Sequence, residues 1–159
     1  MEVNDKAPQF SLLDQDGEKV SLKDLKGQSV VLYFYPRADT PGCTTEACDF
    51  RDEYSKIKKK AVILGVSPDV PEDQKSFAKK FSLPFQLLAD DEKEVAKAYG
   101  VWKEKSMYGK KFMGIERSTF IIGPDGKIKK IFPKVKVKGH AEAVLEALES
   151  ESEKPATKK

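Results

Sequence analysis

The sequence predicts an α/β fold in which a mixed central β-sheet is flanked by helices and preceded by an N-terminal β-hairpin. Short, β-branched apolar runs of strand length alternate with segments of helical periodicity. The 159 residues, of which 39% are hydrophobic and 35% are charged, suffice for one core of ordinary size under a charged surface. We therefore expect a single domain over residues 1–149, followed by a polar tail over residues 150–159 that we expect to be disordered.

Turn residues and one continuous apolar run indicate the first elements. An Asp-Gly pair at positions 16 and 17 favours a hairpin with strands at residues 10–13 and 18–21. The next segment, SLKDL, predicts a short turn of helix that ends at Gly27. SVVLYFYP, residues 29–36, is apolar almost throughout, as is typical of a strand whose two faces are both covered. We expect this run to be the central strand.

The rest of the chain alternates between helical and strand patterns. Helices are predicted over residues 43–58, 71–81, 91–100 and 139–150, strands over 61–67 and 85–89, and a hairpin over 118–132. Helices between successive strands, followed by a hairpin and a last helix, favour a mixed sheet with helices against its faces.

The charge balance narrows the classes of partner. The 29 basic and 26 acidic residues give a net charge of +3 and a field of mixed sign, so we expect no nucleic-acid partner and no membrane partner. The N-terminus, MEVNDKAPQF, carries charges where a secretory signal needs an apolar run. We therefore expect a cytoplasmic protein, in which two neighbouring cysteines are more often catalytic or metal-binding than a permanent disulfide.

Both cysteines lie in the stretch DTPGCTTEACD, residues 39–49. The Thr-Pro-Gly turn at residues 40–42 delivers Cys43 to the first turn of the helix that follows. Unpaired amides and the helix dipole favour a thiolate at that position, and the thiolate is the nucleophilic form of cysteine. The alternative is that both cysteines are small buried hydrophobic residues without a chemical role.

Cys48 stands five residues after Cys43. On a regular helix such residues have Cα atoms about 8.6 Å apart and point roughly 140° away from each other. A disulfide requires Cα atoms within about 7 Å and converging Cβ atoms. Either the two sulfurs never pair, or the start of the helix unwinds so that Cys48 can attack an oxidised Cys43.

These residues resemble a known active-site signature. Pro36, Thr40 and Cys43, spaced as P-x-x-x-T-x-x-C after an apolar strand, are similar to the signature of the peroxiredoxins. TPGCTTEAC resembles the bacterioferritin-comigratory (PrxQ-type) subfamily. The likeness extends from about Val3 to Glu149 and includes YGVW at residues 99–102 and GIERSTFIIG at residues 114–123.

The resemblance implies a thioredoxin-like fold and a thiol peroxidase of the atypical 2-Cys type that reduces hydrogen peroxide and organic hydroperoxides. It assigns the following roles: Cys43 as peroxidatic cysteine, Cys48 as resolving cysteine, Thr40 as a hydroxyl donor, Arg117 as the cation at the thiolate and peroxide, Glu46 as the carboxylate that orients Arg117, and Pro36 as a shield of the pocket. It implies no cofactor and no metal, a thioredoxin-like or glutaredoxin-type reductant, and a monomer or weak dimer.

Each assignment has a structural alternative. Thr40 could be an ordinary helix N-cap, Glu46 a first-turn acid that complements the helix dipole, and Arg117 a surface residue at the start of a strand. We expect His140, the single histidine, to be solvated in the first turn of the last helix. Two cysteines and one distant histidine fall short of the four ligands of a structural zinc site.

A lysine-rich segment, KIKKIFPKVKVKG at residues 127–139, invites a nucleic-acid interpretation. Lysines 134, 136 and 138 alternate with valines 135 and 137, which favours a strand with one solvated face. We prefer the solvated face, because acidic residues elsewhere dilute the positive field.

Two other function classes remain open on the sequence alone. A thiol-disulfide oxidoreductase would share the fold but would prefer C-x-x-C, whose sulfurs bond without unwinding a helix. A binding or chaperone-like protein would need neither Thr40 nor Arg117.

Overall fold

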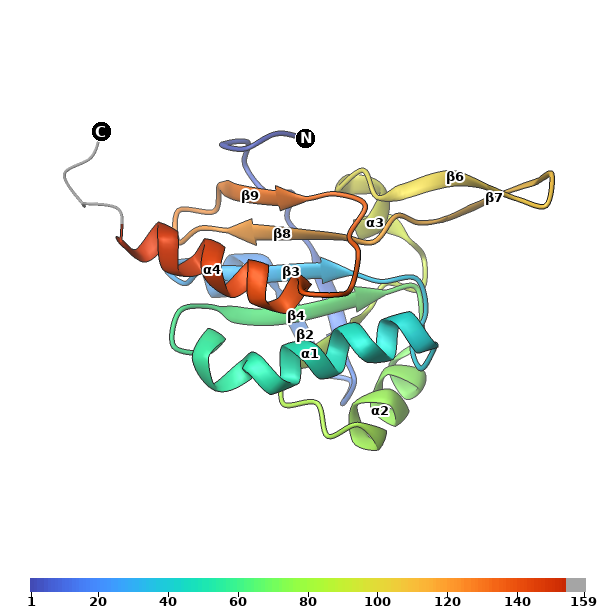
Figure 1. Ribbon diagram of the computed structural model, residues 1–159, viewed down its shortest axis with the longest axis horizontal. Coiled ribbons are helices and arrows are strands. Elements are labelled where there is room, and N and C mark those ends of the chain that lie inside the picture. Colours follow the sequence, from blue (N-terminus) through green and yellow to red (C-terminus); the bar gives the residue numbers. More distant parts are fainter. Residues whose placement is uncertain (154–159) are drawn as a thin grey trace.

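One seven-stranded sheet forms the centre of the computed structural model, which describes residues 1–153 (Figure 1). Its strands are β1 (Ser11–Asp14), β2 (Lys19–Ser21), β3 (Val30–Phe34), β4 (Val62–Ser67), β5 (Gln86–Ala89), β8 (Ser118–Ile122) and β9 (Ile128–Phe132). Strands β6 (Trp102–Met107) and β7 (Lys110–Ile115) lie outside this sheet. The helices are α1 (Pro41–Ile57), α2 (Pro71–Lys80), α3 (Glu94–Ala98) and α4 (His140–Glu153), together with the 3₁₀ turn η1 (Leu22–Leu25).

The sheet is mixed, as predicted. Its strand order is β2-β1-β5-β4-β3-β8-β9, in which β3, β4 and β5 run parallel while β1 and β8 run antiparallel to their neighbours β5 and β3. The two parallel pairs are joined by crossovers that contain α1 and α2, as parallel strands require. The predicted N-terminal hairpin is β1 and β2.

Strand β3 is buried on both faces, which explains its continuous apolar sequence. Val31 and Tyr33 point into one hydrophobic cluster, while Leu32 and Phe34 point into a second cluster on the other face. All four side chains have no exposed surface. Burial of each stabilises the fold by about 1.5–3 kcal/mol, so β3 anchors the sheet from its two sides.

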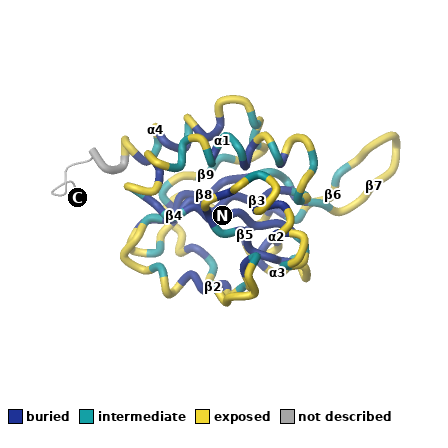
Figure 2. Tube along the Cα trace, turned by 90° about the horizontal axis from the view of Figure 1, so that it is seen from below, coloured by how far each residue is buried: buried dark blue, intermediate teal, exposed yellow. Residues whose placement is uncertain are grey.

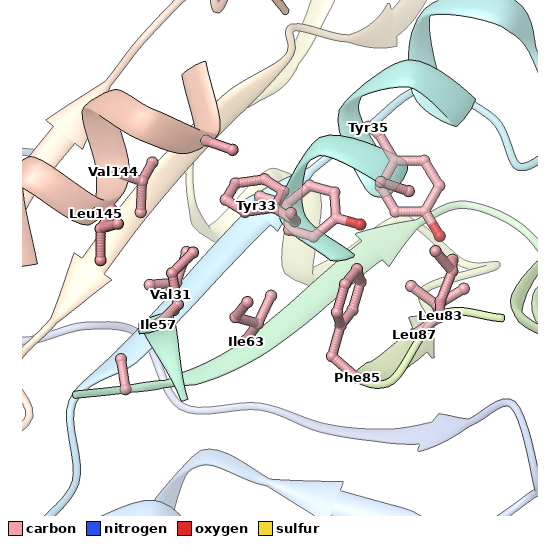
Figure 3. Close-up of a cluster of buried hydrophobic side chains, with 14 of the residues drawn as sticks. Val31, Tyr33, Tyr35, Ile57, Ile63, Leu83, Phe85, Leu87, Val144 and Leu145 are labelled. Atoms are coloured by element: carbon pink, nitrogen blue, oxygen red, sulfur yellow. The ribbon is translucent and has the colours of Figure 1, made fainter. Parts of the chain in front are cut away.

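The first cluster lies between the sheet and two long helices. Figure 3 shows Ile57 at the end of α1, with Val144 and Leu145 of α4, on the same side of the sheet as Val31 and Tyr33. Helices α1 and α4 cover this face (Figures 1 and 2), whereas α3 and the N-terminal segment contribute to the second cluster. The helix that carries both cysteines therefore packs on one cluster only.

In two places the observed strands differ from those that the sequence predicts. Strands β6 and β7 were not predicted; they form a separate two-stranded sheet that projects from the molecule (Figure 1). The predicted strand over residues 134–138 is wrong, because this segment is a loop in which Lys134 has a left-handed φ of 48°. The alternation of exposed lysines with half-buried valines is present, but it arises without a partner strand.

The last helix continues beyond its predicted end. Helix α4 runs to Glu153, three residues past Ser150, and the remainder of the predicted tail, residues 154–159, lies outside the described residues. Within the described part of the chain, every helix is too short or too polar to cross a lipid bilayer.

Candidate active site

Cys43 lies where the central strand meets the helix that follows it. The chain leaves β3 at Phe34 and enters α1 at Pro41, so Cys43 is the third residue of the helix. Its side chain is buried, with 2% of its surface exposed. The carbonyl of Thr40 accepts the first helical hydrogen bond, from the N–H of Thr44 at 2.8 Å. The sulfur is therefore held in the first turn, where helix amides lack backbone partners.

Sheet register brings Arg117 to this sulfur. Strand β8 runs antiparallel to β3 and pairs Ser118 with Phe34, so the residue before Ser118 stands at the end of β3. There the Arg117 guanidinium contacts two side chains of α1. Its Nη2 donates a hydrogen bond to Cys43 Sγ at 3.3 Å, and its Nη1 donates to Glu46 Oε1 at 2.6 Å. The guanidinium thus links the thiol to a carboxylate three residues further along the helix.

Glu46 is the sixth residue of α1 and is almost fully buried, with 1% exposed. The alternative in which it is a first-turn acid is wrong, since the first turn of α1 contains no acidic residue. Burial raises the pKa of Glu46 to about 7, even though the charge and hydrogen bond of Arg117 act in the opposite direction. Among the described residues, its second oxygen, Oε2, has no hydrogen-bond partner.

Gly42 leaves room for the guanidinium. A Cβ atom at this position would lie 3.2 Å from Arg117 Nη2, closer than an ordinary contact. The sequence assigned Gly42 to the turn and its amide to the donors at the peroxide, but not to a contact with Arg117, because the approach of Arg117 depends on a pairing between distant strands.

Cys48 lies on the same helix, half-buried, and both cysteines are free thiols. Because α1 is helical from Pro41 to Ile57, the two sulfurs have the i, i+5 relation that a disulfide cannot bridge. The structure therefore shows the arrangement of a reduced protein.

Thr40 occupies the N-cap position of α1 but makes no side-chain cap. Its Oγ1 instead donates a hydrogen bond to the carbonyl of Arg37 at 2.9 Å. The alternative in which Thr40 caps the helix through its side chain is therefore wrong. Pro36 is half-buried in the loop between β3 and α1. The predicted roles of Thr40 and Pro36 toward a substrate stay predictions.

Comparison with known proteins identifies the family. The sequence model of the AhpC/TSA protein family matches residues 3–131 of this chain. Peroxiredoxin Bcp of Bacillus subtilis is 52% identical over 155 residues, which are 97% of this chain and 99% of that protein. The chain belongs to the Bcp-type peroxiredoxins of the AhpC/TSA family. Peroxiredoxin Bcp of Escherichia coli K12 is 49% identical over 146 residues, or 91% of this chain and 94% of that protein.

Solved peroxiredoxin structures share the fold. A cysteine-to-serine mutant of PrxQ from Xylella fastidiosa superposes with a TM-score of 0.91 at 38% identity, covering 96% of this chain and 98% of that one. The bacterioferritin comigratory protein of Xanthomonas campestris, described for its alkyl peroxide reduction activity, gives a TM-score of 0.87 at 41% identity, covering 91% and 92%. The predicted thioredoxin-like fold is confirmed, and as a peroxiredoxin the protein is a thiol peroxidase.

His140 is the residue of this peroxiredoxin that sequence reasoning placed wrongly. It is buried rather than solvated, with 6% exposed, and its Nε2 lies 2.7 Å from Thr119 Oγ1 in a hydrogen bond. Its ring meets the edges or faces of Phe50 and Phe132. Burial, with a smaller contribution from the charge of Arg117, lowers the pKa of His140 to about 4. The histidine is therefore neutral near pH 7.

Proposed function

We propose that this peroxiredoxin reduces hydrogen peroxide and organic hydroperoxides through the thiolate of Cys43. The observation that carries the proposal is the contact of Arg117 Nη2 with Cys43 Sγ at 3.3 Å, made by a guanidinium that Glu46 holds from its other side. A cationic donor at the sulfur favours the nucleophilic thiolate. The same fork has further N–H groups to offer a bound peroxide.

In the first step the Cys43 sulfur attacks one peroxide oxygen in line with the O–O bond. An S–O bond forms, the O–O bond breaks, and the departing alkoxide or hydroxide takes up a proton, so that Cys43 becomes a sulfenic acid. Negative charge grows on the departing oxygen, and donors must already be aimed at it. Arg117, the hydroxyl of Thr40 and the amide of Cys43 are the candidates, with Thr40 turning away from the Arg37 carbonyl to serve.

In the second step the Cys48 thiol attacks the sulfenic sulfur, which forms the Cys43–Cys48 disulfide and releases water. This step requires the first turns of α1 to unwind and the Arg117–Glu46 contact to break, because the helical spacing keeps the sulfurs apart. A dithiol protein of the thioredoxin or glutaredoxin type then reduces the disulfide. Such a cycle needs no cofactor and serves antioxidant defence in the reducing cytoplasm.

Organic hydroperoxides are included because of a relative. The Xanthomonas campestris neighbour, 41% identical, is described for alkyl peroxide reduction. The sulfur here lies at the end of the sheet, beside the Arg117 fork, and both small and substituted peroxides carry the O–O group that this fork would contact.

The decisive experiment mixes fully reduced protein with one equivalent of hydrogen peroxide, or of cumene hydroperoxide, in a stopped-flow instrument. Cys43 should react orders of magnitude faster than free cysteine, and mass analysis should find it joined to Cys48. Cys48→Ser is the matched control: it should keep the fast first step and accumulate sulfenic and more oxidised forms of Cys43. A Cys43 that reacts no faster than a free thiol would refute the proposal.

A further inference from the structure

The hairpin of β6 and β7, residues 102–115 and here called the arm, exposes an unusual amount of apolar surface. Four of its side chains are exposed: Met107, Tyr108, Phe112 and Met113, with 57%, 96%, 43% and 48% of their surface accessible. These are half of the large hydrophobic residues exposed in the described part of the chain. Figure 2 shows the projecting end of the arm as exposed. Methionine and aromatic residues are enriched where proteins bind one another.

The arm also carries the net charge of the protein. It contains four lysines and one glutamate, a formal charge of +3 that equals the charge of the whole chain, so the remainder is formally neutral. Two of these lysines have acidic neighbours: Lys103 pairs with Glu116 at 3.1 Å and Lys111 approaches Glu104 at 3.7 Å. Within residues 1–153, Lys105 and Lys110 make no ion pair with the chain itself. Their charges are available to a partner.

The unpaired lysines share one face of the arm with apolar side chains. Lys105 lies opposite Phe112, and Met107 lies opposite Lys110. Residues opposite each other, and alternate residues along a strand, point to the same side, so these four form one surface, here called the basic face. Its chemistry, cations around an apolar centre, is complementary to an acidic surface with an apolar patch.

Tyr108, at the tip of the arm, has a backbone conformation that no packing within the described chain stabilises. Tyr108 and Gly109 form a two-residue turn in which both φ angles are positive, 53° and 77°. Such turns favour Asn-Gly or Asp-Gly, and the backbone of a tyrosine is strained at a positive φ. With 96% of its surface exposed, the ring makes almost no packing contacts that could offset this strain. We therefore expect the aromatic ring at the tip to make its stabilising contacts with a binding partner and not within the chain.

The base of the arm is fixed beside the active site. Strand β7 ends at Ile115, two residues before Arg117, and the N–H of Glu116 donates to the carbonyl of Val101 at 2.8 Å across the base. The arm projects from the same end of the molecule as the N-terminus of α1 (Figure 1). A protein that approaches a disulfide between Cys43 and Cys48 comes to this end.

We propose that the arm docks the dithiol protein that reduces the oxidised enzyme, and that this thioredoxin-like partner presents an acidic surface with an apolar centre beside its thiols. The inference rests on the proposed function. One partner thiolate attacks the disulfide to form a mixed disulfide, and the second partner thiol then releases the enzyme, so the partner loses two electrons and the enzyme gains two thiols. Lys105 and Lys110 speed the encounter, while Tyr108 and Phe112 are buried on docking.

The charge component is tested with a bacterial thioredoxin of net negative charge, recycled by its reductase and NADPH. Lys105→Glu combined with Lys110→Glu should lower kcat/KM for thioredoxin about tenfold, mainly through KM, and should flatten its dependence on salt. Lys23→Glu with Lys26→Glu is the matched control, because these exposed lysines flank the opposite end of β3 and should leave KM unchanged. Reduction by dithiothreitol and oxidation by peroxide should be the same in all three proteins.

The tip is tested by Tyr108→Asn, which creates the preferred Asn-Gly turn. The variant should melt no lower than the parent protein and yet show a KM for thioredoxin raised several-fold. A loss of docking therefore cannot be attributed to loss of folding.

Four outcomes overturn the inference. They are an unchanged KM in both arm variants, failure of thioredoxin to reduce the parent protein, binding to phosphatidylglycerol vesicles that depends on the same lysines while KM is unchanged, and a dimer in sedimentation that Tyr108→Asn dissociates while KM is unchanged. Failure of the proposed function is distinguishable, because it would abolish the fast oxidation of Cys43 by peroxide, which the arm does not influence.

Discussion

Arg117 divides its guanidinium between a nucleophile and a buried carboxylate. Its two terminal nitrogens reach Cys43 at 3.3 Å and Glu46 at 2.6 Å, so the carboxylate fixes the orientation in which the sulfur is contacted. A lysine has a single point charge and cannot hold both partners in this geometry.

Removal of the guanidinium should therefore slow the attack on peroxide. We expect Arg117→Ala to lower the second-order rate constant about 10²-fold, the usual cost of one aimed donor, and Arg117→Lys to recover only part of the loss. Stopped-flow oxidation by hydrogen peroxide measures both. Arg37→Ala, in an exposed residue of the loop between β3 and α1, is the control and should change the rate little. Equal rates for Arg117→Ala and the parent protein would remove Arg117 from the mechanism.

Two neighbouring tyrosines of the first cluster differ in one respect. Within the described chain, the buried hydroxyl of Tyr33 has no hydrogen-bond partner, whereas that of Tyr35 donates to Gln74 Oε1 at 2.6 Å. Tyr33→Phe should therefore leave the free energy of unfolding unchanged or raise it by about 1 kcal/mol, while Tyr35→Phe should lower it by about 1–2 kcal/mol. Urea denaturation of the pair is the measurement, and equal losses in both variants would contradict the expectation.

At the residue scale, the sequence predicts the local part of the site. Cys43 could be placed in the first turn of a helix because Thr-Pro-Gly precedes it, and that placement is confirmed. The family resemblance singled out Arg117 and Glu46, and no local pattern reveals that the register of β3 and β8 brings them together. His140 was misplaced because its burial depends on Phe50, which is distant in sequence, and on Phe132 and Thr119, which a loop and the pairing of β8 with β9 bring to its ring.

At the scale of elements, α1 has to be stable enough to hold Cys43 and weak enough to open at its start. Its first turns contain Gly42, Thr44 and Thr45, all of modest or low helix propensity. The hydroxyl of Thr45 bonds back to the carbonyl of Pro41 at 3.0 Å, an interaction that does little to support a helix. These residues favour unwinding at the end where the disulfide would form.

Helix propensity at exposed Thr45 should therefore control the rate of disulfide closure. Thr45→Ala should stabilise the first turns by about 0.5 kcal/mol and slow closure roughly two-fold, with more overoxidation of Cys43, and Thr45→Gly should have the reverse effect. Ser55→Ala and Ser55→Gly make the matched change near the other end of α1, where nothing has to unwind. Closure is followed by quenched-flow mass analysis. Equal effects at both positions would show that unwinding is not confined to the N-terminal turns.

The elements that were predicted correctly have strong local signals. Strand β3 is a continuous apolar run, and the hairpin of β8 and β9 has Pro-Asp-Gly at its turn. The arm lacks such a signal, because charged and apolar residues occur on both of its faces and Tyr-Gly is an uncommon turn. The loop at residues 134–138 shows the opposite case, in which alternation reflects contact with the body of the protein and not a strand.

At the scale of the whole molecule, Glu46 and His140 are two buried groups near Arg117 whose pKa values are shifted in opposite directions. The pKa of Glu46 is raised from 4.5 to about 7, so the folded state holds this proton more tightly and stability falls as pH rises from about 4.5 to 7. The pKa of His140 is lowered from 6.5 to about 4, so the unfolded chain binds this proton first and stability falls as pH drops from about 6.5 to 4. Between pH 4.5 and 6.5 the two effects oppose each other.

A variant that removes one of these two groups should show the pH dependence of stability that the other group causes. Glu46→Gln should lose stability on acidification from pH 6.5 to 4.5, whereas His140→Asn should gain stability as pH falls from 7 to 4.5, each by up to about 3 kcal/mol. Urea titrations at four pH values give the slopes. Asp49 and Asp90, whose pKa values burial also raises, contribute equally to all the proteins compared. Parallel slopes for the two variants would contradict the assignment.

The sheet separates two hydrophobic clusters, and α1 contacts only one of them. Opening of α1 on oxidation would therefore loosen the Tyr33 side of the molecule and leave the Phe34 side as it was. In an amide hydrogen-exchange experiment, the protection of the α1 backbone would then report whether the protein is reduced or oxidised. The protection of α3 and of the second cluster would be the same in both states and would serve as the internal reference.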